Sequence, residues 1–325
     1  MRQGGVHGRW LGLAGVVTVG AVLTAYLGYV AVLGSRRLMH PGHRPFEPVE
    51  GLPASPADLG LAFENVSFRT GDGLSLTGWL IPAGQPTRAA VVVLHGFTGH
   101  RMGELAAYVP WLQPRYNVMQ FDFRGHGASD PAPITVGTNE RRDIAAAVAF
   151  LQDREFGPIA LLGLSMGGAA AIVAGAELPV AAVVADASFA ELRNPIANRM
   201  RTEGYPFPTL GARAILLAAA VRARARLVSP LSRVARLAPR ALLLIAPRDD
   251  QLIDYTQSLK LFAAAGEPRE LYVVDGAEHA AARWVGGEEY QRRILGFLDR
   301  HLGTSSSGAS GPATIIAPIP SARGA

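Results

Sequence analysis

The chain has 325 residues, 49% of them hydrophobic, which allows one large α/β domain or two small ones with a sizeable core. It contains no cysteine, which excludes disulfides, cysteine nucleophiles and thiolate metal sites. The net charge is +5, and every basic residue except Lys260 is arginine. In a sequence this rich in Ala and Gly we attribute the arginines to compositional bias and expect no nucleic-acid partner.

The first predicted element is an apolar helix near the N-terminus. Residues 10–33 contain no charged side chain. As a helix at ~1.5 Å per residue they would span about 36 Å, enough for a hydrocarbon core of ~30 Å. A signal-peptide core is usually about 7–15 residues long, so we expect residues 1–34 to be an uncleaved single-pass anchor in the cell membrane. Arginines flank both ends of the apolar run and leave the orientation open.

The two segments that flank the rest of the chain have unusual compositions. Residues 35–60 are rich in proline and polar side chains, which predicts a tether between membrane and folded domain. Residues 303–325 consist mostly of Ser, Gly, Pro and Ala, and we expect this tail to be disordered. The folded domain is therefore expected to comprise residues 61–302.

Strand and helix patterns alternate through that domain. A Thr-Gly-Asp-Gly turn at residues 70–73 predicts a hairpin. Thr138 is expected to start a helix through a capping box in which Arg141 replaces the usual acid. The alternation predicts the α/β class, with a mostly parallel sheet covered by helices on both faces. The predicted strands cover 61–69, 74–81, 89–94, 116–121, 158–162, 180–185, 240–246 and 271–274, and the predicted helices cover 138–153, 166–175 and 288–302.

One segment interrupts the alternation. Residues 191–239 lie between two predicted strands, exceed the length of a usual crossover loop, and carry nine arginines against two acidic residues. We interpret residues 190–239 as an inserted helical cap over the site. A basic cap beside a bilayer could contact anionic lipid headgroups, although a solvated basic face has the same composition.

The stretch 163-GLSMG-167 lies between a predicted strand and a predicted helix. This is the G-x-S-x-G pattern, in which a sharp turn pushes a serine hydroxyl out above a sheet. The residues two positions either side of Ser165 must be nearly without side chains, and Gly163 and Gly167 satisfy that need. Gly168 lets the following helix pack closely. Gly and Ser also form ordinary turns, but the flanking elements favour Ser165 as a nucleophile.

A serine nucleophile needs a general base, and the base needs an orienting acid. Among the eight histidines, His279 follows the last predicted strand near its carboxyl end. Asp249 and Asp250 follow the preceding strand, and only one of them should face His279 because adjacent loop residues usually point apart. The order Ser, Asp, His along the chain is the order expected of such a site. Asp186, which follows another strand, is the alternative acid.

The oxyanion of an acyl-transfer intermediate needs preorganised donors. We expect one to be the backbone N–H of Met166 at the start of its helix, aided by the helix dipole. The second should come from 95-HGFTG-99, with the N–H of Phe97 as first choice and that of Thr98 as the alternative. Glycines at positions 96 and 99 let this loop pass close to a substrate.

Five motifs follow one another along the chain: HGFTG at 95–99, DFRGHGASD at 122–130, GLSMGG at 163–168, RDDQLI at 248–253 and GAEHA at 276–280. In this order they resemble the α/β-hydrolase superfamily, from about residue 61 to residue 302. The resemblance assigns the acid to Asp250, although Ala246-Pro247 stand where the family usually has His-Gly, and it implies a structural role for Arg124 and His126. The N-terminal region is similar to membrane-anchored bacterial hydrolases and to monoacylglycerol-lipase-like or depalmitoylase-like relatives.

The resemblance implies hydrolysis of a carboxylic ester, a thioester or an amide through an acyl-serine, with no metal and no organic cofactor. Ser165 would attack, His279 would carry the proton, and Asp250 would orient the imidazole. The expected partners are a small-molecule acyl ester and, through the N-terminal helix, a membrane that would supply lipidic substrates. Two alternatives stay open: a serine peptidase or amidase of the same fold, and a catalytically silent binding protein, which would normally have lost a triad residue.

Overall fold

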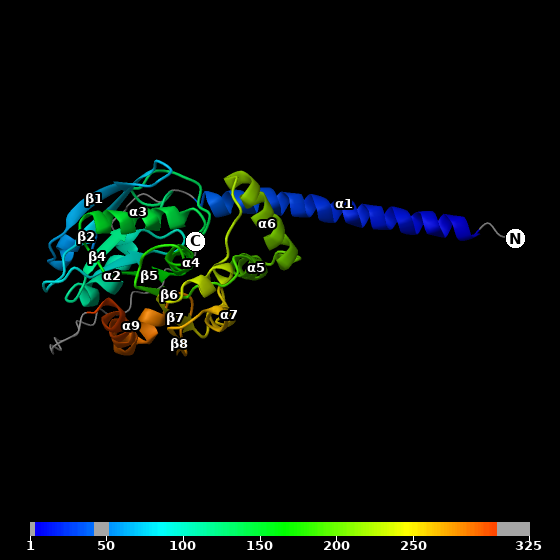
Figure 1. Cartoon of the computed structure of the whole chain (residues 1–325). Helices are drawn as coiled ribbons and strands as arrows, with labels where there is room; N and C mark the ends of the chain where they lie inside the picture. Colours follow the sequence, from blue (N-terminus) through cyan, green and yellow to red (C-terminus); the bar gives the residue numbers. More distant parts are fainter. Residues whose placement is uncertain (1–3, 42–51, 304–325) are drawn as a thin grey trace.

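The computed structural model describes residues 4–41 and 52–303 (Figure 1). Residues 42–51 of the expected tether and 304–325 of the expected tail lie outside the described residues. The strands are β1 (Glu64–Arg69), β2 (Ser75–Ile81), β3 (Ala90–Leu94), β4 (Asn117–Phe121), β5 (Ile159–Leu164), β6 (Ala182–Asp186), β7 (Ala241–Pro247) and β8 (Arg269–Val274). The helices are α1 (Gly4–Met39), α2 (Arg101–Leu112), α3 (Glu140–Asp153), α4 (Met166–Gly175), α5 (Arg193–Thr202), α6 (Pro208–Ala223), α7 (Thr256–Ala264), α8 (Ala282–Val285) and α9 (Gly287–Leu302), with short 3-10 turns at Pro56–Leu59, Pro230–Ser232 and Val234–Arg236.

The strands form one mixed sheet in the order β1-β2-β4-β3-β5-β6-β7-β8. β2 pairs antiparallel with β1 and β4, and every pairing from β4 to β8 is parallel. The predicted, mostly parallel sheet is therefore confirmed. In such sheets functional groups collect beyond the carboxyl ends of the strands. The register aligns Leu94 with Gly163 and Leu164 with Asp186, so β3, β5 and β6 end at one edge.

Helices cover both faces of the sheet (Figure 1). The side chains of β3 show how the core is divided between these faces. Val92 and Leu94 belong to the cluster that contains the buried residues of α3, α4 and α7. Val91 and Val93 belong to the cluster that contains those of α2, α8 and α9. Successive strand residues point to opposite faces, so an uninterrupted apolar strand fills two cores.

The N-terminal helix extends beyond the expected anchor boundary at residue 34. α1 continues to Met39, where Ser35 and Met39 are buried and the Met39 carbonyl accepts a hydrogen bond from the N–H of Ile134 (2.9 Å). Within α1, the segment 16–39 is long enough, and over most of its length apolar enough, to cross a membrane, by length and composition alone. Figure 1 shows α1 projecting from the domain at the end where it meets α6.

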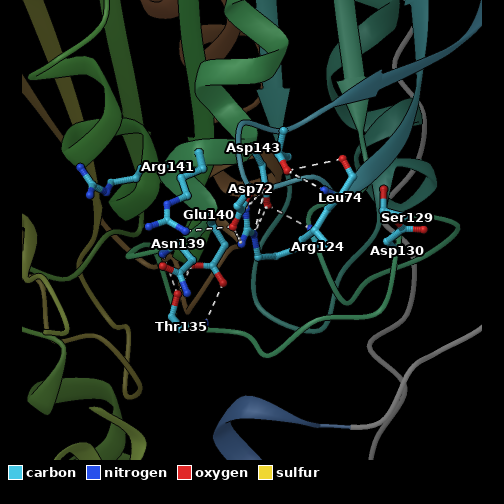
Figure 2. Close-up of polar contacts among 12 residues, drawn as sticks. Asp72, Leu74, Arg124, Ser129, Asp130, Thr135, Asn139, Glu140, Arg141 and Asp143 are labelled. Atoms are coloured by element: carbon cyan, nitrogen blue, oxygen red, sulfur yellow. Dashed lines mark hydrogen bonds and ion pairs between the residues drawn. The ribbon is translucent and has the colours of Figure 1, made fainter. Parts of the chain in front are cut away.

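The start of α3 corrects the capping-box prediction. α3 begins at Glu140, whose carboxylate accepts hydrogen bonds from the N–H (2.7 Å) and the hydroxyl (2.8 Å) of Thr135 (Figure 2). The hydroxyl of Thr138 instead accepts from the N–H of Val228 (2.9 Å). Arg141 donates to the Thr138 carbonyl (3.1 Å). The prediction was wrong because the carboxylate of Glu140, at the first position of α3, accepts the hydrogen bonds of the preceding turn. The hydroxyl of Thr138 accepts one from a loop far along the chain instead.

Candidate active site

Ser165 occupies the turn between β5 and α4, with φ 54° and ψ −114°. A Cβ atom added to Gly163 would lie 2.3 Å from the carbonyl carbon of Gly167, and one added to Gly167 would lie 2.4 Å from the Leu94 oxygen. Both distances are far below van der Waals contact, so a side chain at either position would force the turn apart. The two glycines therefore permit the strained conformation that presents Ser165 at the carboxyl edge of the sheet.

Three side chains from different loops meet at this edge. The Nε2 atom of His279 lies 3.1 Å from the Oγ atom of Ser165, and its Nδ1 atom lies 2.6 Å from Oδ2 of Asp250. Oδ1 of Asp250 accepts hydrogen bonds from the N–H groups of Leu252 (2.9 Å) and Ile253 (2.8 Å). The Asp250 side chain has no exposed surface, whereas 25% of the His279 side chain is exposed. The arrangement can pass a proton between the hydroxyl and the imidazole beside a fixed negative charge.

The two adjacent aspartates after β7 point apart, as expected. Asp250 is buried and Asp249 is exposed. The Asp249 N–H donates to the carbonyl of Ala277 (2.9 Å), and the N–H of Arg248 donates to that of Val274 (3.0 Å). These backbone bonds join the acid loop to the histidine loop and set the separation of Asp250 from His279.

Asp186, the alternative acid, is fully buried at the end of β6 and has a different partner. Its Oδ2 atom accepts a hydrogen bond from the hydroxyl of Tyr290 (2.9 Å), and its Oδ1 atom has no hydrogen-bond partner within residues 4–41 and 52–303. Its backbone carbonyl accepts from the N–H of Ser165 (2.8 Å). Burial raises the pKa of the Asp186 carboxyl to about 6. Asp186 thus supports the serine turn through its backbone carbonyl, a role that its sequence position did not reveal.

The two amides expected to bind an oxyanion come from segments beside Ser165. Met166 is the first residue of α4, where helix geometry gives the N–H no partner inside the helix. The loop that contains Phe97 turns through a bond from the N–H of Gly99 to the carbonyl of Gly96 (3.1 Å). A Cβ atom added to Gly96 would lie 3.6 Å from the Cβ atom of Ser165. The structure brings both segments to the nucleophile, and the roles of the Phe97 and Met166 amides stay a prediction.

His95 holds this loop in place. Its imidazole is buried, which lowers its pKa well below the usual value. Nδ1 lies 2.8 Å from the Gly96 carbonyl, and Nε2 accepts a hydrogen bond from the N–H of Phe123 (3.1 Å). A neutral ring protonated on Nδ1 satisfies both contacts. A histidine within a predicted oxyanion loop is ambiguous in sequence, because its burial and its hydrogen-bond partners are seen only in the fold.

The loop after β4 is held by a buried ion pair. Arg124 donates to both Asp143 on α3 and Asp72 in the β1–β2 turn, with closest distances of 2.7 Å and 2.8 Å (Figure 2). The Arg124 and Asp143 side chains are 4% and 0% exposed. Hydrogen bonding to Arg124 lowers the pKa of Asp72 well below its usual range. The Nδ1 atom of His126 lies 2.9 Å from the Arg124 carbonyl. These contacts join parts of the scaffold to one another, as expected for structural residues.

The segment between β6 and β7 contacts the acid loop. The side-chain amide of Asn198 on α5 donates to the carbonyl of Leu252 (3.0 Å). Leu252 is the residue whose N–H donates to Asp250. α5 therefore helps to fix the loop that holds Asp250. The sequence contained no pattern that pairs residues so far apart in the chain.

Known proteins resemble the chain in sequence and in structure. The family profile described as "Serine aminopeptidase, S33" matches residues 85–204. Protein YfhR of Escherichia coli O157:H7 is 30% identical over 249 residues, which cover 72% of this chain and 80% of YfhR. The α/β hydrolase domain-containing protein WAV2 of Arabidopsis thaliana is 25% identical, and the match covers 91% of this chain and 95% of WAV2. The structure of the Pyrococcus furiosus esterase Pf2001 superimposes with a TM-score of 0.66 and 30% identity, covering 80% of this chain and all of that esterase.

Proposed function

Because the chain belongs to the α/β-hydrolase superfamily, we propose that it is a serine hydrolase that cleaves carboxylic esters of acyl substrates. The observation that carries the proposal is the continuous contact from Ser165 through His279 to buried Asp250. Such a chain supplies a nucleophile, a base and an orienting acid in one place. Likeness to the esterase Pf2001 supports an ester as the substrate.

In the acylation step, the Oγ atom of Ser165 attacks the ester carbonyl carbon while Nε2 of His279 takes the hydroxyl proton. The N–H groups of Phe97 and Met166 stabilise the oxyanion of the tetrahedral intermediate. His279 then returns the proton to the leaving alkoxide, the carbon–oxygen bond breaks, and the alcohol departs. Asp250 holds the Nδ1–H tautomer and stabilises the imidazolium that forms between these events.

Deacylation repeats the sequence with water. His279 takes a proton from the water molecule, whose oxygen attacks the acyl-serine carbonyl. The second tetrahedral intermediate collapses with protonation of Ser165 Oγ, and the carboxylic acid leaves. A thioester substrate follows the same steps with a thiol as the leaving group.

A serine peptidase or amidase is the second candidate, since the matching family profile is described as an aminopeptidase. An aminopeptidase needs a carboxylate that can pair with the free ammonium group of its substrate. Asp250 is committed to His279 and two backbone amides, and Asp186 is inaccessible and bonded to Tyr290. These two buried acids are therefore not available to pair with a substrate ammonium group.

The N-terminal helix acts in this proposal as an uncleaved membrane anchor. α1 is apolar over most of its length, and its last residues pack on the domain, with Val30, Ser35 and Met39 buried. Removal of α1 as a signal peptide would expose the residues that it covers. The intact mass of the protein purified from membranes decides between the two: the full-length mass supports an anchor, and loss of residues before about position 34 contradicts it.

Labelling with a fluorophosphonate probe tests the proposed activity without knowledge of the substrate. Wild-type protein and Ser188→Ala should label, whereas Ser165→Ala should not. Ser188 is the matched control because it is a buried serine beside the same turn. Hydrolysis of p-nitrophenyl esters of increasing chain length, compared with aminoacyl p-nitroanilides, then separates esterase from amidase. Folded wild-type protein that does not label would favour the catalytically silent alternative.

A further inference from the structure

α1 and α6 pack against each other in a fixed order. The Tyr26 hydroxyl donates to the Pro206 carbonyl (2.6 Å) just before α6 begins. At the other end of α6, the guanidinium of Arg222 donates to the Ser35 hydroxyl (2.9 Å). The two helices therefore advance in the same direction (Figure 1). These two bonds place the start of α6 level with Tyr26 and its end level with Ser35.

The inner side of α6 is buried by this packing. Ala212 and Ile215 of α6 form a buried cluster with Val30 of α1 and with Ala197 and Met200 of α5. The outer side carries an apolar stripe, here called the α6 stripe, at helical spacing. Its members and their exposed fractions are Phe207 (57%), Leu210 (43%), Leu217 (70%) and Val221 (70%). Large apolar side chains that are exposed along one side of a helix indicate an interaction site.

The aromatic residues of α1 set the depth of this site in a bilayer. Trp10 and Tyr29 bound a stretch of 20 residues without charge, which spans about 30 Å and equals the thickness of a hydrocarbon core. Trp and Tyr gather at the two interfaces of a membrane. Tyr26 and Tyr29 therefore belong at the interface nearer the domain. The bond from Tyr26 to Pro206 brings the first turn of α6 to that level.

Charged residues support the same placement. Arg36 and Arg37 on α1 are exposed at the level where α6 ends, and Arg222, Arg224 and Arg226 are exposed at the end of α6. Arginines at this height can meet lipid headgroups. Near the start of α6, Arg201 and the ion pair between Arg199 and Glu203 are also exposed, which keeps this end in the interface rather than in the hydrocarbon.

We propose that the α6 stripe is a bilayer-contact surface, with Phe207 and Leu210 inserted deepest into the leaflet beside α1. The occupant is lipid because α6 packs on α1, whose own exposed side chains, such as Val19 and Val22, are also apolar. This inference rests on the proposed membrane anchor but not on the proposed hydrolysis. The segment between β6 and β7 would then contact both the bilayer, through α6, and the acid loop, through α5. Asn198 of α5 bonds to the acid loop, and α5 packs on α6.

The absence of cysteine makes the test direct, because one introduced cysteine can be labelled alone in the full-length chain. Three variants, Leu210→Cys, Val19→Cys and Leu259→Cys, are labelled with an NBD fluorophore and reconstituted in phosphatidylcholine vesicles. The vesicles contain lipids with a nitroxide on the acyl chain. Val19 lies in the middle of the apolar part of α1, and Leu259 is an exposed leucine on α7, away from the α6 stripe.

We expect the Leu210 fluorophore to lose fluorescence to the lipid nitroxide, less than at Val19 and much more than at Leu259. Quenching at Val19 without quenching at Leu210 would overturn the bilayer-contact surface while leaving the anchor in place. Absence of quenching at both Val19 and Leu210 would overturn the anchor and this inference together. A Leu210 fluorophore shielded from water but not quenched by lipid would assign the stripe to a second copy of the chain and also overturn the proposal.

Discussion

Oδ2 of Asp250 lies 2.6 Å from Nδ1 of His279, whereas the neighbouring Asp249 points to solvent. The difference between these two aspartates gives a matched pair of substitutions. Asp250→Asn keeps the shape of the side chain but can offer an N–H to Nδ1, which favours the wrong tautomer of the imidazole. Loss of an equivalent charge in a serine triad lowers kcat roughly 10⁴-fold.

We therefore expect Asp250→Asn to lose about four orders of magnitude in kcat and Asp249→Asn to lose little. The measurement is the hydrolysis rate of a p-nitrophenyl ester by both purified variants. A large loss in Asp249→Asn with little effect in Asp250→Asn would contradict the assignment.

Asp186 makes a pH-dependent contribution to stability. Its folded-state pKa of about 6 lies above the value of about 3.9 for an unfolded aspartate. The folded protein therefore binds the proton more tightly, and the free energy of unfolding falls as pH rises from about 4 to 6. Above about pH 6 the buried carboxylate of Asp186 lowers the free energy of unfolding by about 2 to 3 kcal/mol relative to its protonated form.

Asp186→Asn removes this charge and keeps an oxygen that can accept from Tyr290. We expect the variant to unfold at a higher temperature than wild type at pH 8, with the difference shrinking below pH 5. Its hydrolysis rate should stay near that of wild type, since Asp186 bonds Tyr290. Melting curves at several pH values check the first expectation. A loss of activity as large as that of Asp250→Asn would return Asp186 to the role of triad acid.

The sequence predicted those parts of the site that depend on local backbone geometry. The strained turn at Ser165 needs glycine at fixed positions, so its pattern is readable along the chain. His279 and the aspartate pair became candidates because both follow predicted strands, whose ends were expected at one edge. The choice between Asp249 and Asp250 required a family resemblance, since local spacing gives no side-chain direction.

Contacts between distant segments were not predictable in this way. Tyr290 reaches Asp186 from the last helix, and Asn198 reaches Leu252 from α5. The wrong start for α3 has the same origin, because the Thr138 hydroxyl is used by Val228 far along the chain. Spacing rules describe neighbours within one element, whereas these bonds depend on how elements pack.

Gly167 offers a test of the tight serine turn. A Cβ atom at this position would lie 2.4 Å from the Leu94 oxygen, whereas one at Gly103, near the start of α2, would have no atom within 4 Å. Gly167→Ala must displace backbone, and overpacking of this kind costs about 1 to 3 kcal/mol. Gly103→Ala should stabilise by about 0.5 to 1 kcal/mol, since it favours the helix. Urea unfolding of both variants measures the difference, and equal effects would contradict the close approach of β3 to the turn.

Arg124 is expected to matter for folding and not for chemistry. Arg124→Met leaves the carboxylate of Asp143 buried without its partner, which costs about 3 to 5 kcal/mol. The control is Arg292→Met on α9, whose side chain is 72% exposed in its ion pair with Glu289 and should contribute less than about 1 kcal/mol. Thermal unfolding checks both values. Fluorophosphonate labelling of the Arg124→Met protein that remains folded should be as fast as in wild type, and slow labelling would indicate a catalytic role.

The α6 stripe predicts different effects on soluble and membrane-bound substrates. Full burial of one such apolar side chain stabilises by about 1.5 to 3 kcal/mol. Replacing Phe207 and Leu210 by serine removes this gain at both positions. Partial insertion in the interface should therefore make hydrolysis of a long-chain ester presented in vesicles roughly tenfold slower. Hydrolysis of soluble p-nitrophenyl acetate should not change, because neither residue contacts the triad. Leu259→Ser on α7 controls for a general loss of exposed leucine. Equal losses on both substrates would mean that the double variant perturbs the fold, and no loss on vesicles would show that the stripe does not present the enzyme to lipid.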